Sequence, residues 1–425
     1  MSKHQGYLPG FVALSPILVF LVVYLLSSLL AADFYKVPVS SAFLLASVYA
    51  VVITPGKLTY RVSIFSESAG HWNIMLMVWI FMLAGAFAGS AKEIGSVEAT
   101  VNFTLSIVPA KTLLAGLFLT ACFVSLAIGT SVGTIVALVP IANGIADETG
   151  LNQAMMAALI VGGSFFGDNL SFISDTTIAA TRAVGCAMKD KFRANFMLVL
   201  PAVLFVTGIY IYKGLSIDNA SDTGPIEWLK LLPYISIIVL ALFGLDVTMV
   251  LVIGIMLNAV VGFGTDSFDW YGFLGSMGSG IAGMGDLIIV TLLAGGMLGI
   301  IRYNGGLEYI IRGISRHVHG RMGAELGIGV LTSLANFCTA NNTIAIITVG
   351  SIVNDISDKY QIPKRRAASL MDIFSCFVQG IIPYGAQLLM AAGLTGLATT
   401  QIIPYLYYPF AVGICVLLSI LIPRR

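Results

Sequence analysis

Apolar runs of about 20 residues recur along almost the whole chain, and a helix needs about this length to cross the hydrocarbon of a bilayer. Hydrophobic residues make up 58% of the sequence and charged residues only 10%, against about 25% charged residues in soluble domains. So few charges cannot cover a water-facing surface. Because a helix satisfies its own backbone hydrogen bonds in lipid, the sequence predicts an all-α polytopic membrane protein with the lipid bilayer as its main partner.

Simple membrane crossings are expected at 11–30, 39–54, 73–90, 195–213, 231–246, 248–264, 285–303 and 402–422. Lys and Arg favour short cytoplasmic loops, and these crossings place every basic cluster on one side of the membrane. The clusters are Lys57 with Arg61, Lys189 with Lys191 and Arg193, Arg302–Arg321, Lys359–Arg366, and Arg424 with Arg425. Both termini are therefore expected in the cytoplasm, and we expect a prokaryotic inner or plasma membrane.

Two apolar stretches, 112–146 and 324–356, must begin and end on the same side of the membrane. Each has a centre of small and polar residues, Gly129–Thr134 in the first and Thr339–Thr343 in the second. Non-helical backbone is tolerated at membrane depth only where protein or a wet cavity surrounds it. The sequence predicts re-entrant hairpins with buried tips; two short tilted crossings joined at the surface are the alternative.

Two further stretches, 151–188 and 367–400, cross once but are too long for one straight helix. About 35 helical residues would extend roughly 50 Å, whereas the hydrocarbon core is about 30 Å thick. Each has a polar, helix-breaking middle, Gly167–Asp175 and Gln379–Gly385. Both are predicted to be helices broken near the middle of the membrane.

Residues 1–215 and 228–425 therefore share one order of elements: three crossings, a re-entrant hairpin, a broken helix and a final crossing. The first hairpin opens outside and the second inside, which predicts inverted repeats, and inverted repeats with broken helices are typical of secondary transporters. The sequence contains no phosphate-binding loop and no histidine or cysteine pattern for a metal or redox centre. We expect no enzyme activity and no cofactor, and the net charge of +1 does not favour a nucleic-acid partner.

Asp168 and Asp175 are the strongest candidates for a functional site. Both fall within a predicted crossing, where a carboxylate costs at least a few kcal/mol. Hydroxyl groups surround them in the sequence, at Ser171, Ser174, Thr176 and Thr177. Oxygen ligands suit a hard cation, and burial favours the protonated form of a carboxylic acid, so Na⁺ and H⁺ are expected to compete at these two residues. The alternative is that each Asp caps a helix at the break.

Polar residues at the hairpin tips and in the second broken helix complete the candidate site. The tips offer Thr130, Ser131 and Thr134, and Thr339, Asn341, Asn342 and Thr343. They would coordinate the ion or bind a substrate, or they only satisfy the backbone of the tips. Gln379, Tyr384 and Gln387 are expected to line the cavity. Asp372 would gate or relay protons, or pair with Arg365 or Arg366.

Gly162–Thr177, which reads GGSFFGDNLSFISDTT, closely resembles the signature of the NhaC-type Na⁺/H⁺ antiporter family, and Gly129–Thr134 is similar to another segment of that family. The resemblance covers roughly residues 70–400. It implies the fold of the ion transporter superfamily, with a scaffold, a transport domain that moves like an elevator, and a homodimer.

The second half departs from the antiporter pattern. Asn341 stands where the family has an Asp, Met371 with Asp372 replaces an acidic pair, and Gln379–Gly385 replaces a segment of different sequence. These changes remove charge from one side of the site. Exchange of Na⁺ for H⁺ is the leading hypothesis, and Na⁺- or H⁺-coupled transport of a small organic acid or amino acid is the alternative.

Overall fold

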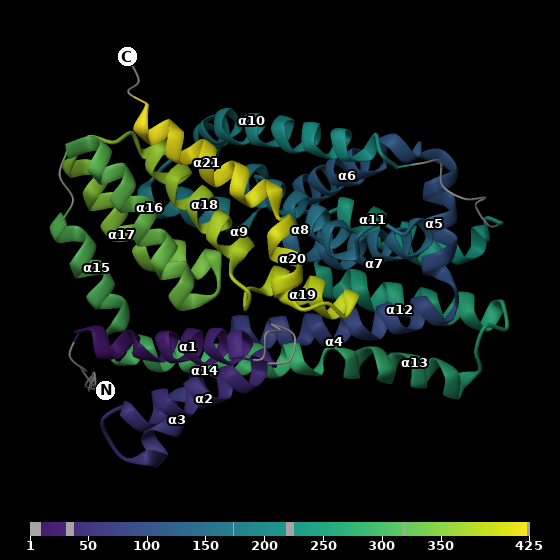
Figure 1. Ribbon diagram of the computed structural model, residues 1–425, viewed down its shortest axis with the longest axis horizontal. Helices are drawn as coiled ribbons and strands as arrows, with labels where there is room; N and C mark the ends of the chain where they lie inside the picture. Colours follow the sequence, from purple (N-terminus) through teal and green to yellow (C-terminus); the bar gives the residue numbers. More distant parts are fainter. Residues whose placement is uncertain (1–9, 31–37, 173, 218–224, 318–319, 423–425) are drawn as a thin grey trace.

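The computed structural model of the protein describes residues 10–30, 38–172, 174–217, 225–317 and 320–422, and in these ranges every regular element is helical (Figure 1). The elements of the first half are η1 (Gly10–Leu14), α1 (Ser15–Leu30), α2 (Val39–Ile53), α3 (Leu58–Ala69), α4 (Trp72–Glu93), α5 (Ser96–Ile107), η2 (Ala110–Thr112), α6 (Leu113–Ile128), α7 (Ser131–Thr149), α8 (Gln153–Leu170), α9 (Asp175–Val184) and α10 (Met188–Gly214).

In the first half, a helical hairpin (α6–α7), a broken helix (α8–α9) and a final helix (α10) follow one another, and the second half repeats this order. Its elements are α11 (Trp228–Leu242), α12 (Val247–Gly264), α13 (Trp270–Gly283), α14 (Gly285–Tyr303), α15 (Gly306–His317), α16 (Gly320–Thr339), α17 (Asn342–Lys359), α18 (Lys364–Ile381), α19 (Ala386–Thr395), α20 (Thr399–Ile402), η3 (Ile403–Tyr405) and α21 (Tyr407–Leu421).

The predicted all-α polytopic fold is confirmed. Seven helical spans among the described residues are long and apolar enough to cross a membrane, and an eighth is added if the bent pair Thr399–Tyr405 and Tyr407–Leu421 forms one span. The expected crossings 11–30, 39–54 and 231–246 correspond to shorter apolar helices, Gly10–Tyr24, Val39–Ile53 and Trp228–Leu242.

Both long segments contain the expected interruption. The first is helical as α8 and again as α9, with Leu170 and Asp175 on either side of the break, and the second is interrupted between Ile381 and Ala386. The two predicted hairpins are the helix pairs α6–α7 and α16–α17. The first arm of the α6–α7 hairpin differs from a short re-entrant loop, because Ala110–Ile128 is itself long enough to cross a membrane.

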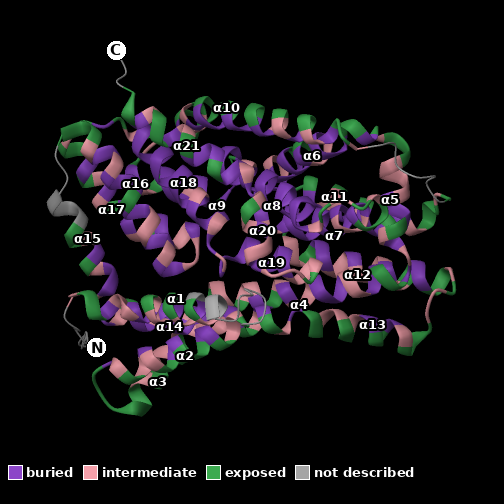
Figure 2. Cartoon of the chain, viewed as in Figure 1, coloured by how far each residue is buried: buried purple, intermediate pink, exposed green. Residues whose placement is uncertain are grey.

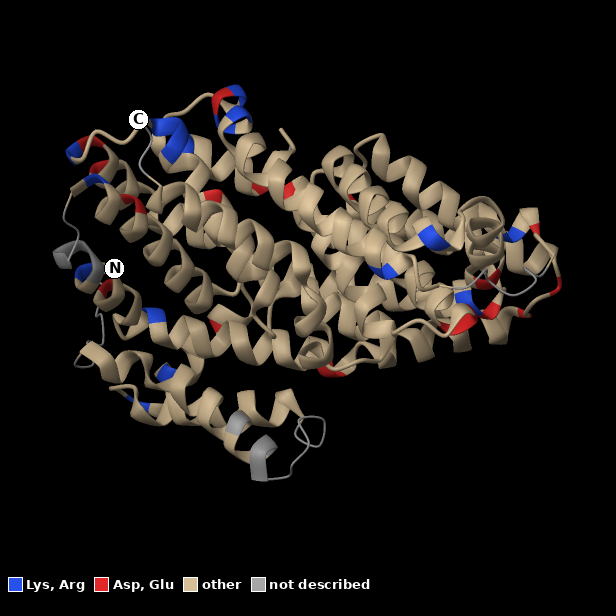
Figure 3. Cartoon of the chain, turned by 45° about the horizontal axis from the view of Figure 1, so that its top comes forward, with Lys and Arg blue, Asp and Glu red and all other residues tan. Residues whose placement is uncertain are grey.

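The hairpins and broken helices form the buried centre of the molecule (Figure 2). Helices α6 and α7 both pack against α8, and α16 and α17 both pack against α18. In Figure 1 the α16–α17 hairpin lies towards the end of the molecule where α21 ends, and the α6–α7 hairpin lies towards the opposite end. The two hairpins thus approach the middle of the fold from opposite ends. Figure 3 shows Lys and Arg gathered mainly at the end that carries both chain termini.

A second group of helices lies along one side of this centre. Helix α4 packs against α12 and α13, and α14 packs against α2 and α3. Helix α13 occupies a glycine-rich stretch between two expected crossings. It approaches α4 so closely that a Cβ atom added at Gly280 would overlap the carbonyl oxygen of Gly85, which is the small-residue packing common between membrane helices.

Substitution of Gly280 tests this close approach. We expect Gly280→Ala to push α13 away from α4 and to lower the free energy of unfolding by about 1–3 kcal/mol, as overpacking does. Gly278 lies on the same helix with open space around the position of a Cβ atom, so Gly278→Ala is the matched control. A thermal melt of the detergent-purified protein compares the two variants; equal melting temperatures would contradict the packing described here.

Candidate ion-binding site

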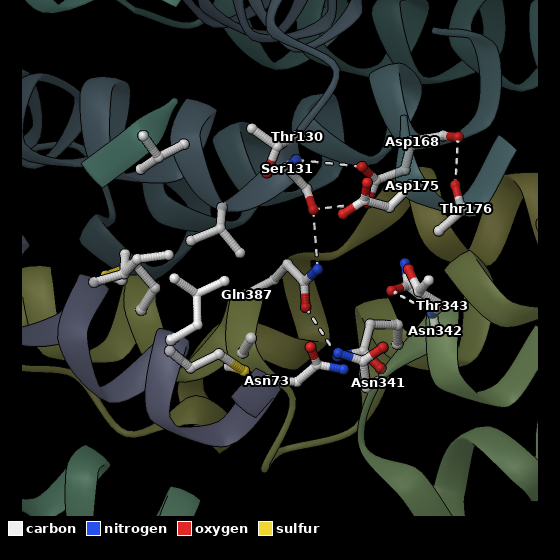
Figure 4. Close-up of a pocket in the computed structure, with 18 of the residues that line it drawn as sticks. Asn73, Thr130, Ser131, Asp168, Asp175, Thr176, Asn341, Asn342, Thr343 and Gln387 are labelled. Carbon is white, nitrogen blue, oxygen red and sulfur yellow. Dashed lines mark hydrogen bonds between the residues drawn. The ribbon is translucent and has the colours of Figure 1, made fainter. Parts of the chain in front are cut away.

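A cavity of about 200 Å³ lies where the hairpin tips and both helix breaks meet (Figure 4). The predicted site residues that line it are Thr130, Ser131, Asp168, Ser174, Asp175, Thr176, Asn341, Asn342, Thr343, Gln379 and Gln387. Among its described lining residues, Asp168 and Asp175 are the only ionisable ones. The structure therefore brings together residues from four separate segments of the chain around two carboxyl groups.

Four helices begin at this cavity. Helix α7 begins at Ser131, α9 at Asp175, α17 at Asn342 and α19 at Ala386, and all four residues line the cavity. The N-terminus of a helix carries a partial positive charge of roughly half an elementary charge and presents unpaired N–H groups. The helix ends thus offset much of the negative charge that the two carboxylates would carry when ionised.

Asp168 is held by the N-terminus of α7. Its side chain is only 4% exposed. The backbone N–H of Ser131 donates to one carboxyl oxygen at 3.2 Å, and the hydroxyl of Ser131 donates to the other at 2.7 Å. Gln387 donates to the Ser131 hydroxyl at 2.9 Å, and Gln379 donates to Gln387 at 3.0 Å. A chain of hydrogen bonds therefore connects the carboxyl group in the first broken helix to the second broken helix.

Asp175 lies at the first residue of α9 and is exposed to the cavity. Next to it, the hydroxyls of Ser174 and Thr176 are 3.0 Å apart. Thr176 donates to the backbone carbonyl of Asp168 at 2.9 Å. This carbonyl is one of those left without an intrahelical partner where α8 ends, and the hydroxyl of Thr176 satisfies it.

The tip of the second hairpin uses polar side chains to cap its own backbone. Ala340 has a φ of +50°, in the left-handed region that is costly for residues other than glycine. The Asn341 side chain accepts from the N–H of Ile344 at 2.9 Å, and the Asn342 side chain accepts from the N–H of Thr343 at 3.0 Å. These contacts agree with the alternative that the polar side chains satisfy the backbone of the tip. Asn341, Asn342 and Thr343 also face the cavity.

Some predicted site residues do not line the cavity. Thr134 donates to the carbonyl of Thr130, Thr339 to that of Asn341, and Tyr384 to that of Phe337, at 2.9–3.1 Å. Ser171 ends α8, with its N–H bonded to the carbonyl of Gly167. Thr177 and Asp372 belong to a neighbouring buried cluster. The hydrogen bonds of these residues stabilise the backbone of the hairpin tips and of the helix breaks.

One of the two alternatives for Asp372, its pairing with Arg365 or Arg366, is wrong. Asp372 forms an ion pair with Lys191 at 2.9 Å, and both side chains are buried, with 0% and 1% exposure. Arg366 pairs with Glu325 at 2.8 Å instead. Lys191 was expected in a cytoplasmic loop, but it lies in the first turn of α10, where α10 packs against α18 and α9.

Sequence reasoning missed Lys191 because it stands between Lys189 and Arg193 and resembles part of a solvated basic cluster. One signal was available. Lys191 and Asn195 are four residues apart and share one helix face, and in the structure both donate to Asp372 and to the carbonyl of Asn169.

The outer wall of the cavity was also missed. It comes from α4 and α12, and its residues are Asn73, Leu76, Met77, Ile80, Phe81 and Val247. The α4 residues recur at helical spacing, which in a sequence looks the same as an ordinary lipid-facing or core stripe. The cavity thus lies between the buried centre of the fold and the second group of helices.

A polytopic helical protein in which hairpin tips and broken helices meet around a buried carboxyl group has the architecture of a secondary transporter. The model of the Na⁺/H⁺ antiporter family matches residues 9–215 and 228–423. The chain belongs to this family, and it is a secondary antiporter of the membrane.

Three known proteins illustrate what the chain is similar to. It is 24% identical to the malate-2H⁺/Na⁺-lactate antiporter of Bacillus subtilis, over 94% of this chain and 93% of that protein. It is 23% identical to the Na⁺/H⁺ antiporter NhaC of Alkalihalophilus pseudofirmus, over 78% and 79%. The crystal structure of the YdaH transporter of Alcanivorax borkumensis aligns with a TM-score of 0.42 and 16% identity, over 87% of this chain and 90% of that chain.

The bond between Ser131 and Asp168 can be measured by a double-mutant cycle. We expect the effects of Ser131→Ala and Asp168→Asn on the free energy of unfolding to be non-additive by about 0.5–2 kcal/mol, because the two side chains share a buried hydrogen bond. As a control, Ser131→Ala combined with Thr54→Ala, at a buried threonine that bonds to Ala50 and Asn304, should be additive within about 0.5 kcal/mol. Additivity in both pairs would show that the bond is absent.

Proposed function

We propose that the protein exchanges Na⁺ for H⁺ and that Asp168, assisted by Asp175, carries both ions in turn. The observation that carries this proposal is the cavity itself, whose only ionisable described lining residues are these two carboxylates. Burial penalises a lone ionised carboxylate, so such a group is accompanied by either a proton or a cation. The hydroxyls of Ser131, Ser174 and Thr176 add oxygen atoms of the kind that a hard cation binds.

The cavities next to the site indicate that the site is open to the cytoplasm in this structure. A second cavity of about 410 Å³ runs between α9 and α17 and shares Asp175 and Thr343 with the central cavity. Both helices continue from there towards Arg182 and Lys359, which stand next to expected cytoplasmic loops. A third cavity of about 760 Å³, bordered by Glu93, Glu98, Asp147 and Glu148, shares no described lining residue with the central one.

We further propose that transport proceeds by an elevator-like movement of inverted repeats. The central cavity lies between the hairpins and broken helices on one side and α4 and α12 on the other, and the residues that α4 and α12 contribute are apolar except for Asn73. The proposed repeats are residues 1–215 and 228–425, and each contains a hairpin and a broken helix. Apolar surfaces can slide without breaking ion pairs. The proposal includes a homodimer in a bacterial inner membrane with both termini in the cytoplasm.

Flux in proteoliposomes tests the exchange. A Na⁺ pulse should dissipate an imposed pH gradient across vesicles that contain the wild-type protein, and Asp168→Asn should reduce the rate at least about 100-fold, because Asn can neither bind nor release the proton. Asp266→Asn is the matched control, since Asp266 is exposed at a loop with a φ of +51° that Asn also tolerates. Retained exchange in Asp168→Asn would rule out Asp168 as the carrier of the ions.

A second candidate function is exchange that moves a small carboxylate or an amino acid with the coupling ion. The convergence of four helix N-termini favours it, because such ends bind anionic groups, and side-chain amides of Asn341, Asn342 and Gln387 face the same space. The relative from Bacillus subtilis is a malate/lactate antiporter by name. A cavity of about 200 Å³ is below the usual 300–1,000 Å³ of drug-sized ligands, so any such substrate is small.

The same vesicles separate the two candidates. Lactate or malate, added on one side, should leave the Na⁺-driven proton flux unchanged if only cations are exchanged. A flux that requires the carboxylate and that is lost in Gln387→Ala would favour the second candidate and contradict simple cation exchange.

A cross-link tests the movement. A Cβ atom added at Gly133 of α7 would lie 2.8 Å from a methyl group of Val247 in α12. In a variant without the five native cysteines, Gly133→Cys with Val247→Cys should form a disulfide that abolishes exchange, and reduction should restore it. The single-cysteine variants serve as controls. Full exchange by protein whose cross-link is complete would contradict an elevator-like movement at this boundary.

A further inference from the structure

Lys191 is surrounded by oxygen atoms at the end of α8. Its ammonium nitrogen lies 2.9 Å from a carboxyl oxygen of Asp372, 2.8 Å from the backbone carbonyl of Asn169 and 2.6 Å from the hydroxyl of Thr177. An ammonium group has three N–H donors, and each has one of these acceptors. The Lys191 side chain is 1% exposed and that of Asp372 is 0% exposed.

These three acceptors are of the kinds that coordinate a cation at a broken helix. In secondary transporters, unwound backbone carbonyls and the C-terminal ends of half-helices coordinate the coupling cation, and carboxylate and hydroxyl oxygens complete the coordination of hard cations. The carbonyl of Asn169 belongs to the last turn of α8, which carries partial negative charge. The oxygen atoms around the ammonium are therefore of the kinds that would coordinate a monovalent metal ion.

We propose that the ammonium of Lys191 is a tethered cation that permanently occupies this second cation site, so that Na⁺ does not bind at Asp372. For the exchange proposed above, on which this consequence rests, Asp168 and Asp175 are then the carboxylates left for transported ions, and Asp372 takes no part in the ion stoichiometry. The occupancy of the site by Lys191 does not depend on which substrate is transported.

The three oxygen atoms around the ammonium form a cage, and Lys191 is not the only residue that holds this cage in position. Asn195, one turn further along α10, donates to the same carboxyl oxygen of Asp372 and to the same carbonyl of Asn169, both at 2.7 Å. The carbonyl and the carboxylate thus stay positioned when the lysine is shortened. A buried carboxylate that has lost its partner is strongly destabilising and binds either a proton or a cation, so in melts at alkaline pH the emptied cage should take up a small cation from solution.

Na⁺-dependent melting of three purified variants tests the proposal. Asp168→Asn provides the background, in which the exchange site is removed. Adding Lys191→Ala should create a melting temperature that rises by about 2–4 °C or more when choline chloride is replaced by NaCl at equal ionic strength. Adding Asp372→Asn as well should abolish the rise, because the new site loses its carboxylate.

An Asp168→Asn/Lys191→Ala protein that folds and melts at the same temperature in Na⁺ and in choline would overturn the proposal. If this variant is poorly stable, purification in NaCl or methylammonium chloride should yield more folded protein than purification in choline chloride, since either small cation fits the emptied cage. Equal yields in all three salts would also count against it. The background lacks Asp168 and the test measures no flux. Its result can therefore be interpreted even if the exchange proposal is wrong.

Discussion

Interrupted helices inside a membrane protein leave backbone N–H and C=O groups that lipid cannot satisfy, and the centre of this fold is arranged around that constraint. The carbonyls at the end of α8 receive Thr176, Lys191 and Asn195. The N-terminus of α7 is occupied by the carboxyl group of Asp168. The polar residues that look like a binding site in the sequence therefore have two tasks, because they complete broken backbone and also leave a few oxygen atoms facing a cavity.

The two halves satisfy the interrupted backbone with different side chains, and the regions around the two breaks therefore differ in charge. In the first half a carboxyl group stands at the break, whereas the equivalent region of the second half has two glutamines. Gln379 donates to Gln387, and Gln387 donates to Ser131. Of the two carboxylates that the described part of the second half buries, Asp372 is neutralised by Lys191 from the first half and Glu325 by Arg366. In the exchange proposed here, ion-dependent chemistry is thus concentrated at Asp168 and Asp175, and the amides of the second half form the neutral wall opposite them.

The sequence was sufficient to predict the long apolar helices, the two hairpins and both breaks, because each interruption is marked by polar or small residues inside an apolar run. The shorter helices α3, α5, α13 and α15 were not predicted. The sequence was also sufficient to bring Asp168, Asp175 and Ser131 into one candidate site. It did not reveal the partner of Asp372, because Lys191 is separated from it by almost half the chain and lies among solvated basic residues. The wall from α4 was equally hidden, since Asn73 and Phe81 become site residues only through the packing of α4 against the centre.

An ion-bound structure tests the central claim most directly. Cryo-electron microscopy of the protein in NaCl, and in choline chloride at low pH, would show whether a cation binds where the broken helices meet. The account predicts a Na⁺ density within coordination distance of the Asp168 carboxylate in NaCl and its absence in choline chloride. A Na⁺ density at Asp372 with Lys191 displaced, or no density near Asp168 under conditions of active exchange, would contradict it.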